Sequence, residues 1–162
     1  FQGNQMYHGN TELSLDKAVD VIRYFAASSQ VTNLYKVKLM KLMWYADALA
    51  YKKRGTAITG LVYQALPMGA VPIGHNSIID LKDVPCEEVD MGETNAYHFS
   101  LNGEQSFPAL SEEEKSILDS VIEKLGRMSK TEIINFMHKE KAYISTAPRD
   151  VIQFQYAESL QI

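Results

Sequence analysis

The 162-residue sequence contains a single cysteine, Cys86. One cysteine cannot form an internal disulfide or a multi-thiolate zinc site, and such a chain suits a reducing compartment. We therefore expect a cytoplasmic protein in which Cys86 is a small, half-buried residue of a strand. Nothing in the local sequence around Cys86 would lower the pKa of its thiol.

Long apolar runs and an excess of positive charge are also missing. No run approaches the roughly 20 residues that a membrane span requires, so no membrane partner is expected. The net charge of −4 argues against a general affinity for nucleic acid, because phosphate binding requires clustered positive charge. With 46% hydrophobic and 22% charged residues, the composition is that of an ordinary globular protein.

Sequence motifs for metal or phosphate binding are absent. The histidines show no HExxH spacing, so neither a metal nor a cofactor is predicted; they are His8, His75, His98 and His138. The uncharged stretch ALPMGAVPIG at 65–74 lacks the spacing of a phosphate loop, and its prolines remove N–H donors. We interpret it as a rigid apolar turn packed against a core helix.

The chain divides into a short N-terminal part and one domain. Phe1-Gln2-Gly3 is typical of the remnant of a cleaved purification tag, so 1–13 is interpreted as that remnant plus an N-terminal extension. Ser14 precedes apolar residues spaced three and four apart and predicts the start of a helix. Residues 14–162 are expected to form a single domain, because this length supports one core.

Later segments predict two more helices and a small amount of β-structure. Ser111 with Glu114, and Ser129 with Glu132, match the capping box that starts a helix. A short strand is predicted at 61–66, a β-hairpin by 84–90 and 96–101 around the loop 91–95, and the tail 151–162 is ambiguous. The predicted fold class is α+β and predominantly helical, with a central helix surrounded by helices and a small antiparallel hairpin.

The predicted helix at 34–53 is the candidate central helix. Apolar side chains cover two of its faces and leave a narrow polar stripe, which consists of Lys38, Lys41, Tyr45 and Lys52. This stripe is our candidate partner-binding surface, because basic and aromatic residues suit interfaces. The alternative is that it is only the solvated face of the helix.

Asp47 lies between the two apolar faces of the same helix, away from the lysine stripe. A buried carboxylate is costly without hydrogen-bond donors, so we interpret Asp47 as a structural anchor. Its expected partners are N–H groups of the following loop, or Arg54 and Lys36. A catalytic role is not favoured, because no second acid or histidine can be placed beside it from the sequence.

Four segments together resemble the Panacea, or SocA-like, antitoxin domain family. They are Lys38-Leu39-x-Lys41-Leu42-x-Trp44-Tyr45-Ala46-Asp47, Leu66-Pro67-Met68-Gly69-Ala70-Val71-Pro72, Leu110-Ser111-Glu112-Glu113-Glu114 and His138-Lys139-Glu140-Lys141-Ala142-Tyr143. They occur in the family's order across about 14–160. The family usually has glycine-proline-valine where this chain has Gly69-Ala70-Val71, and tryptophan where it has Tyr143.

The resemblance implies a mostly helical, non-catalytic domain with a small β-element. Members neutralise toxins by direct binding, and a SocA-type member acts as an adaptor that delivers its toxin to a protease. The resemblance therefore predicts an antitoxin whose partner is a cognate toxin. A nucleic-acid-binding regulator of a toxin–antitoxin or phage operon is the alternative, and a hydrolase using Cys86 or Asp47 is a third hypothesis.

Overall fold

The computed structural model describes residues 6–92 and 95–162, apart from the side chain of Asn95. The predicted tag remnant, and residues 93–94 of the predicted hairpin loop, lie outside the described residues. The elements in chain order are α2 (Leu15–Ala27), α3 (Lys36–Arg54), β1 (Tyr63–Leu66), β2 (Gly69–Pro72), α4 (His75–Ile79), β3 (Cys86–Asp90), β4 (Asn95–Phe99), α5 (Glu112–Leu125), α6 (Lys130–His138), α7 (Lys141–Ile144) and the 3₁₀ helix η1 (Phe154–Ser159). The fold is α+β and predominantly helical, as predicted.

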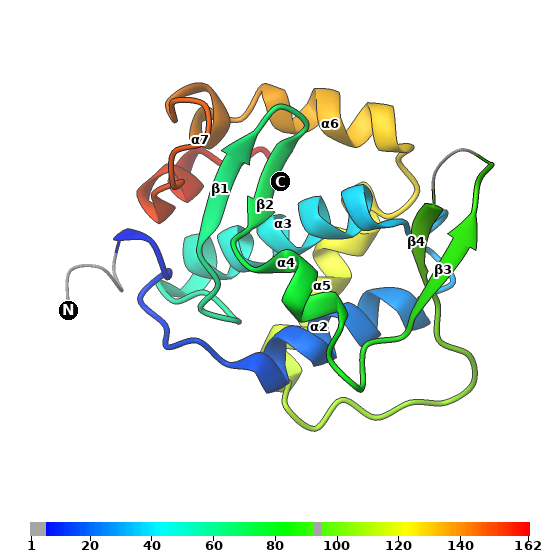
Figure 1. The fold of residues 1–162 in the computed structure, drawn as a ribbon. Coiled ribbons are helices and arrows are strands. Elements are labelled where there is room, and N and C mark those ends of the chain that lie inside the picture. The colour runs from blue at the N-terminus through cyan, green and yellow to red at the C-terminus, as the bar shows by residue number, and fades with distance from the viewer. Residues whose placement is uncertain (1–5, 93–94) are drawn as a thin grey trace.

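Helix α3 runs through the middle of the molecule, between α2 and α6 (Figure 1). It also packs against α5, β2 and η1, and every residue from 38 to 50 is buried. Gly55 ends it in the left-handed conformation with φ of 80°, the usual role of glycine after a helix. The prediction of a central helix is confirmed.

The predicted helix starts are confirmed by their capping hydrogen bonds. The Ser14 hydroxyl accepts from the Lys17 N–H at 3.2 Å before α2. Complete capping boxes at Ser111 and Ser129 begin α5 and α6, so both ends of each serine–glutamate pair satisfy a free N–H group.

The first hairpin corrects the interpretation of residues 65–74. Strands β1 and β2 pair antiparallel from Tyr63↔Pro72 to Leu66↔Gly69, so the stretch read as a turn alone also supplies a strand. Its two prolines do not prevent this pairing. Pro67 lies in the turn between the strands, and Pro72 is the last residue of β2, where a missing N–H is tolerated.

Gly69 allows this hairpin to lie close to α3 and α6. Its φ is 117°, and a Cβ atom there would come within 2.6 Å of Met137 Sδ and 2.8 Å of Lys41 Cε. A side chain at this position would therefore displace the ends of the Met137 and Lys41 side chains, and the positive φ would strain it as well. The predicted packing of this segment against the core helix is confirmed.

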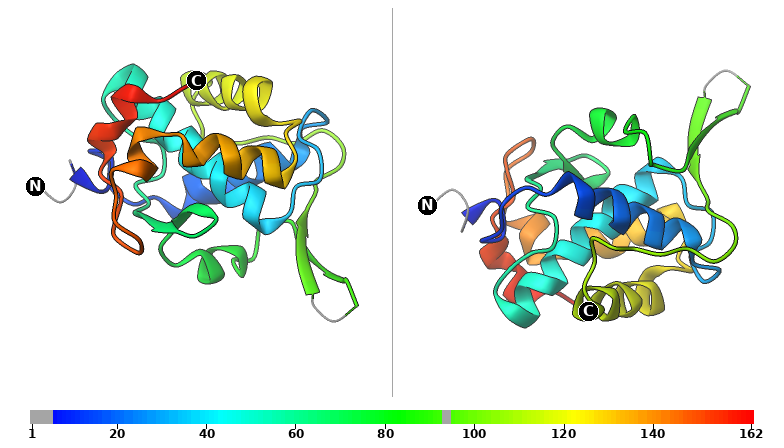
Figure 2. Two further views of the ribbon diagram at one scale, coloured as in Figure 1. Left: turned by 90° about the horizontal axis from the view of Figure 1, so that it is seen from above. Right: turned by 90° about the horizontal axis from the view of Figure 1, so that it is seen from below.

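The second hairpin, formed by β3 and β4, projects from the body (Figure 2). The predicted hairpin is confirmed, and its register runs from Cys86↔Phe99 to Asp90↔Asn95, so Asn95, which the prediction assigned to the loop, begins β4. The Phe99 N–H donates to the Leu34 carbonyl at 2.9 Å, and Tyr35 forms an isolated bridge with His98. These bonds attach the base of the hairpin to the start of α3.

Short elements complete the fold where the sequence pattern was weak or ambiguous. Helices α4 and α7 are too short to show a helical period and were not predicted. The ambiguous tail forms a bridge at Gln64↔Val151 and then η1, whose Phe154 is buried beside Tyr63 and Tyr51. Among the described residues no helix is both long and apolar enough to cross a bilayer.

Candidate partner-binding groove

The structure places most of the predicted lysine stripe inside the protein. Lys38 is 2% exposed, Lys41 1% and Tyr45 0%, whereas Lys52 is exposed. The prediction that these side chains share an outer surface of α3 is therefore wrong for three of the four. The reason is that neighbouring segments cover α3 on the stripe side as well as on its apolar faces.

Lys38 is buried because its ammonium group binds two loop carbonyls. Its Nζ donates to Thr32 O at 2.5 Å and to Gly126 O at 2.6 Å, which joins the loop before α3 to the end of α5. Burial lowers the pKa of Lys38 to about 8. The residue ties two loops together, and its charge is directed inward.

Lys41 and Tyr45 fasten two further segments to α3. Lys41 Nζ donates to Ala70 O of β2 at 3.0 Å, and burial lowers the pKa of Lys41 to about 8. The Tyr45 hydroxyl donates to Glu140 Oε2 at 2.8 Å, and Glu140 also accepts from the N–H of Gln161. Burial raises the pKa of both Tyr45 and Glu140.

Lys52 belongs to the same pattern at the exposed end of α3. Its Nζ donates to Leu160 O at 3.0 Å and to Ile162 O at 3.2 Å. The side chain is exposed, but its donors are directed to the C-terminal segment. A partner-binding role for Lys52 stays a prediction.

Asp47 is fully buried and accepts hydrogen bonds from the loop that follows α3. Oδ1 accepts from the N–H groups of Ile58 at 2.8 Å and Thr59 at 2.9 Å. Oδ2 accepts from the hydroxyls of Thr59 and Tyr63, each at 2.6 Å. Of the expected partners, the loop N–H groups are the ones present, while Lys36 donates to Asn76 instead. Burial raises the pKa of Asp47 although these donors act to lower it.

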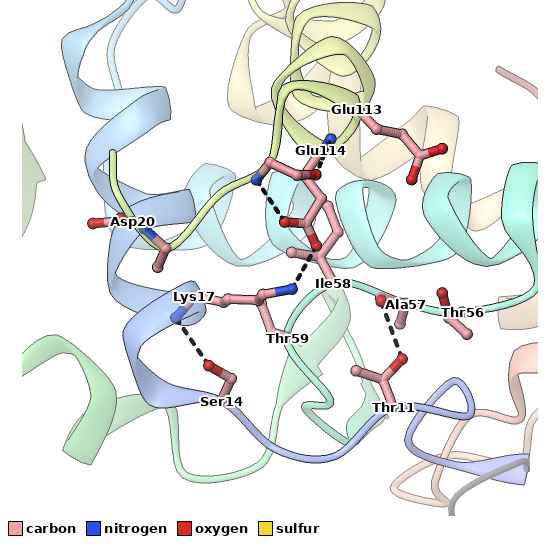
Figure 3. Close-up of polar contacts among 12 residues, drawn as sticks. Thr11, Ser14, Lys17, Asp20, Thr56, Ala57, Ile58, Thr59, Glu113 and Glu114 are labelled. Atoms are coloured by element: carbon pink, nitrogen blue, oxygen red, sulfur yellow. Dashed lines mark hydrogen bonds and ion pairs between the residues drawn. The ribbon is translucent and has the colours of Figure 1, made fainter. Parts of the chain in front are cut away.

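Arg54, the other expected partner of Asp47, joins an ion cluster around Glu114. Arg54 Nη2 lies 3.0 Å and Lys17 Nζ 2.8 Å from Glu114 Oε2. Figure 3 shows Lys17 reaching Glu114 from α2 above the loop that carries Ala57 and Thr59. Burial opposes ionisation, yet bonds from Lys17, the Ser111 N–H and Arg54 hold the pKa of Glu114 below its ordinary value. The sequence predicted the capping role of Glu114 and missed this cluster.

Three of the four segments that carry the family resemblance meet in space. The Tyr143 hydroxyl donates to Leu66 O at 2.7 Å, and His138 Nε2 lies 3.1 Å from Pro67 O. The rings of His138 and Tyr143 stack with centroids 4.6 Å apart. Together with the bonds of Lys41 and Tyr45, these contacts join α3, the first hairpin and the α6–α7 segment.

A groove of about 420 Å³ lies beside the buried Lys38, between the starts of α3 and α6 and the second hairpin. Its lining includes the lysines Lys36, Lys38 and Lys130 and the apolar residues Val37, Met91 and Met128. Tyr97 of β4 completes one wall, and no aspartate or glutamate of the described residues lines the groove. The sequence could not indicate this groove, because its walls come from three separate parts of the chain.

The surroundings of the two candidate nucleophiles, Cys86 and Asp47, do not activate them. Burial raises the pKa of the Cys86 thiol, with Asp80 acting in the same direction, so the thiolate is disfavoured. Asp47 is surrounded by hydrogen-bond donors of its own fold and is closed to solvent. Within 6–92 and 95–162, no three His, Cys, Asp or Glu side chains gather in a way that could hold a metal ion.

We propose that Asp47 anchors the loop after α3, and Asp47→Asn tests this role. The asparagine has one acceptor oxygen where the carboxylate has two, so buried donors lose their partner. The free energy of unfolding should fall by about 2–3 kcal/mol in urea denaturation. Asp83→Asn, at an exposed carboxylate, is the matched control and should change it little. Equal stability of the two variants would refute the anchor role.

Lys41→Met should stabilise the protein, because it removes a buried ammonium group that no carboxylate neutralises. We expect a gain of about 1–2 kcal/mol at pH 7, after allowing for the lost bond to Ala70 O. The pKa of Lys41 is about 8 in the folded protein and 10.5 in the unfolded chain. The cost of burying the charged amine therefore lowers the stability of the wild-type protein in full below pH 8, and this cost disappears as the pH rises to 10.5. In urea denaturation, the stability gain of Lys41→Met over the wild-type protein should therefore be smaller at pH 9.5 than at pH 7. Lys139→Met, at an exposed lysine, should show no such pH dependence; the same dependence in both variants would contradict the prediction.

Comparison with protein families identifies one match. The model of the antitoxin SocA-like, Panacea domain family matches residues 39–143, which is more than half of the chain. Comparison with curated proteins and with solved structures finds no match. The matched region includes Lys41, Tyr45 and Asp47, the first hairpin and Tyr143, which are the residues and segments that the fold joins around α3. The chain therefore belongs to the SocA-like Panacea antitoxin family.

Proposed function

We propose that this protein is an antitoxin that neutralises a cognate toxin by direct, non-catalytic binding. Membership of the antitoxin family supports this role. The partner surface that we propose is the groove between α3, α6 and the second hairpin. The observation that carries this choice is that lysines and apolar side chains line one groove to which the described residues contribute no acid.

Because three of the four residues of the lysine stripe are buried, the proposed interface is the groove and not the stripe. Lys38, Lys41 and Tyr45 are already bonded inside the fold, so a partner could reach them only by opening the protein. The groove, in contrast, contains Lys130 and Met91, which are both exposed. Aromatic residues, methionine and positive charge suit a surface that binds another protein.

The proposal places the protein in the cytoplasm, where Cys86 remains a free thiol. Two modes of neutralisation fit a binding protein of this family. The antitoxin can occupy the toxin and block it, or it can present the bound toxin to a protease. Both modes require a complex, and they differ in whether the amount of toxin falls.

Co-expression with the toxin encoded beside this gene tests the proposal. Induction of the toxin alone should stop growth, and induction of both proteins should restore it. Affinity purification of this chain should recover the toxin, and immunoblotting should show whether toxin abundance stays constant or declines. Neither rescue nor complex formation would refute the proposed function.

The alternative is a nucleic-acid-binding regulator, because the same basic residues could contact phosphate groups. A mobility-shift titration with promoter DNA of the same operon tests it, and salt-dependent binding would support it. The net charge of −4 and the inward direction of Lys38 and Lys41 speak against this alternative.

A further inference from the structure

The groove differs in charge from the chain as a whole. The chain has 20 acidic and 16 basic side chains, yet three lysines line the groove and no described acidic residue does. None of Lys36, Lys38 and Lys130 forms an ion pair with a carboxylate of the described residues; their amines meet carbonyl or amide oxygens, or solvent. Lys38 is buried and already bonded inside the fold, so the positive charge that a negatively charged partner group can reach is that of Lys130 and, in part, Lys36.

The start of α3 adds to this positive potential. Both α3 and α6 begin at the groove, and the N-terminus of a helix carries a partial positive charge. The first turn of α3 contains no acidic residue, and its N-cap residue, Tyr35, forms no side-chain capping bond. At α6 the Glu132 carboxylate of the capping box accepts from the Ser129 N–H and offsets that charge. Lys130 is the first residue of α6 and is exposed, so it is the lysine that a partner can reach most directly.

The apolar part of the groove provides room for a hydrophobic side chain. Met91 is 58% exposed beside the end of β3, and Met128, which precedes α6, is half-buried and also lines the groove. Val37 and Tyr97 also line the groove. Methionine is flexible enough to adapt to a side chain that enters between such walls.

The aromatic rings in the groove do not favour stacking with nucleic acid bases. Lys36 Nζ lies 5.7 Å from the centre of the Tyr97 ring, and the Tyr35 ring packs on His98 with centroids 4.9 Å apart. Single-stranded nucleic acids bind through open aromatic faces on which successive bases stack. Because each ring already has one face in contact with another side chain, a protein segment is the better fit.

We propose that the groove receives an acidic segment of the partner protein. One apolar side chain of the segment enters between Met91 and Met128, and a neighbouring carboxylate pairs with Lys130 at the start of α6. The inference rests on the proposed function and specifies the chemistry that the toxin must present.

The apolar contact is tested with a matched pair of methionine variants and the purified cognate toxin as the probe. Met91→Glu places a charge in the groove and should raise the Kd for the toxin by about tenfold or more. Met68→Glu, at a 47% exposed methionine in the turn of the other hairpin, should leave the Kd unchanged. Equal affinities of the two variants would overturn the inference. Thermal unfolding of both variants checks that each is folded.

The ionic contact is tested by reversing one charge at either end of α6. Lys130→Glu should weaken toxin binding by about tenfold at low salt and by less at high salt, since the paired charges are partly exposed. Lys139→Glu, at the other end of the helix, should bind like the wild-type protein. Toxin variants with single acid-to-lysine changes should include one that recovers affinity for Lys130→Glu, and the absence of any such variant would overturn the ionic contact.

The outcomes separate this inference from the proposed function. If the wild-type protein does not bind or neutralise the toxin, the proposed function fails. If it binds the toxin, and Met91→Glu and Lys130→Glu bind the toxin as tightly as the wild-type protein does, the function stands and the groove is not the interface. If Lys130→Glu instead abolishes a mobility shift with operon DNA and leaves toxin binding intact, the groove binds nucleic acid and the inference is wrong.

Discussion

The fold depends on polar side chains of a buried helix that bind the backbone of the segments around it. Lys38 binds the loops at Thr32 and Gly126, Lys41 binds β2, and Asp47 binds the loop after α3. Loops carry carbonyl and N–H groups that cannot all pair within a regular element, and a buried group without a partner is costly. A central helix with long polar side chains satisfies such groups from the inside. The cost is that Lys38 and Lys41 are desolvated, and their lowered pKa reflects that cost.

This arrangement explains which parts of the structure the sequence could predict. Helix starts at Ser14, Ser111 and Ser129 are local, because the capping hydrogen bonds span only three residues. The position of Asp47 between two apolar faces is likewise a property of one helix, and it indicated that hydrogen-bond donors must lie nearby. The sequence pattern was least informative where an element is short or contains proline, and β2 was consequently read as part of a turn.

The candidate site could not be predicted for a different reason. A helical period shows which residues share a face, but it does not show what packs on that face. Lys38, Lys41 and Tyr45 form a polar stripe on α3, and only the tertiary structure shows that Gly126, Ala70 and Glu140 cover it. The groove raises the same difficulty, because Met91 and Lys130 come together only after the chain has folded.

The residues of the family motifs, taken with these contacts, hold the scaffold together, and our proposal assigns partner recognition to the groove at its margin. Amine-selective labelling of the native protein at pH 8, followed by mass spectrometry, tests this division most directly. Because the pKa of Lys38 and Lys41 is lowered to about 8, either amine would react faster than an ordinary lysine if reagent could reach it. Our account predicts that both stay unlabelled until the protein unfolds, while the exposed Lys130 and Lys139 react readily. Rapid labelling of Lys38 and Lys41 in the folded protein would contradict it.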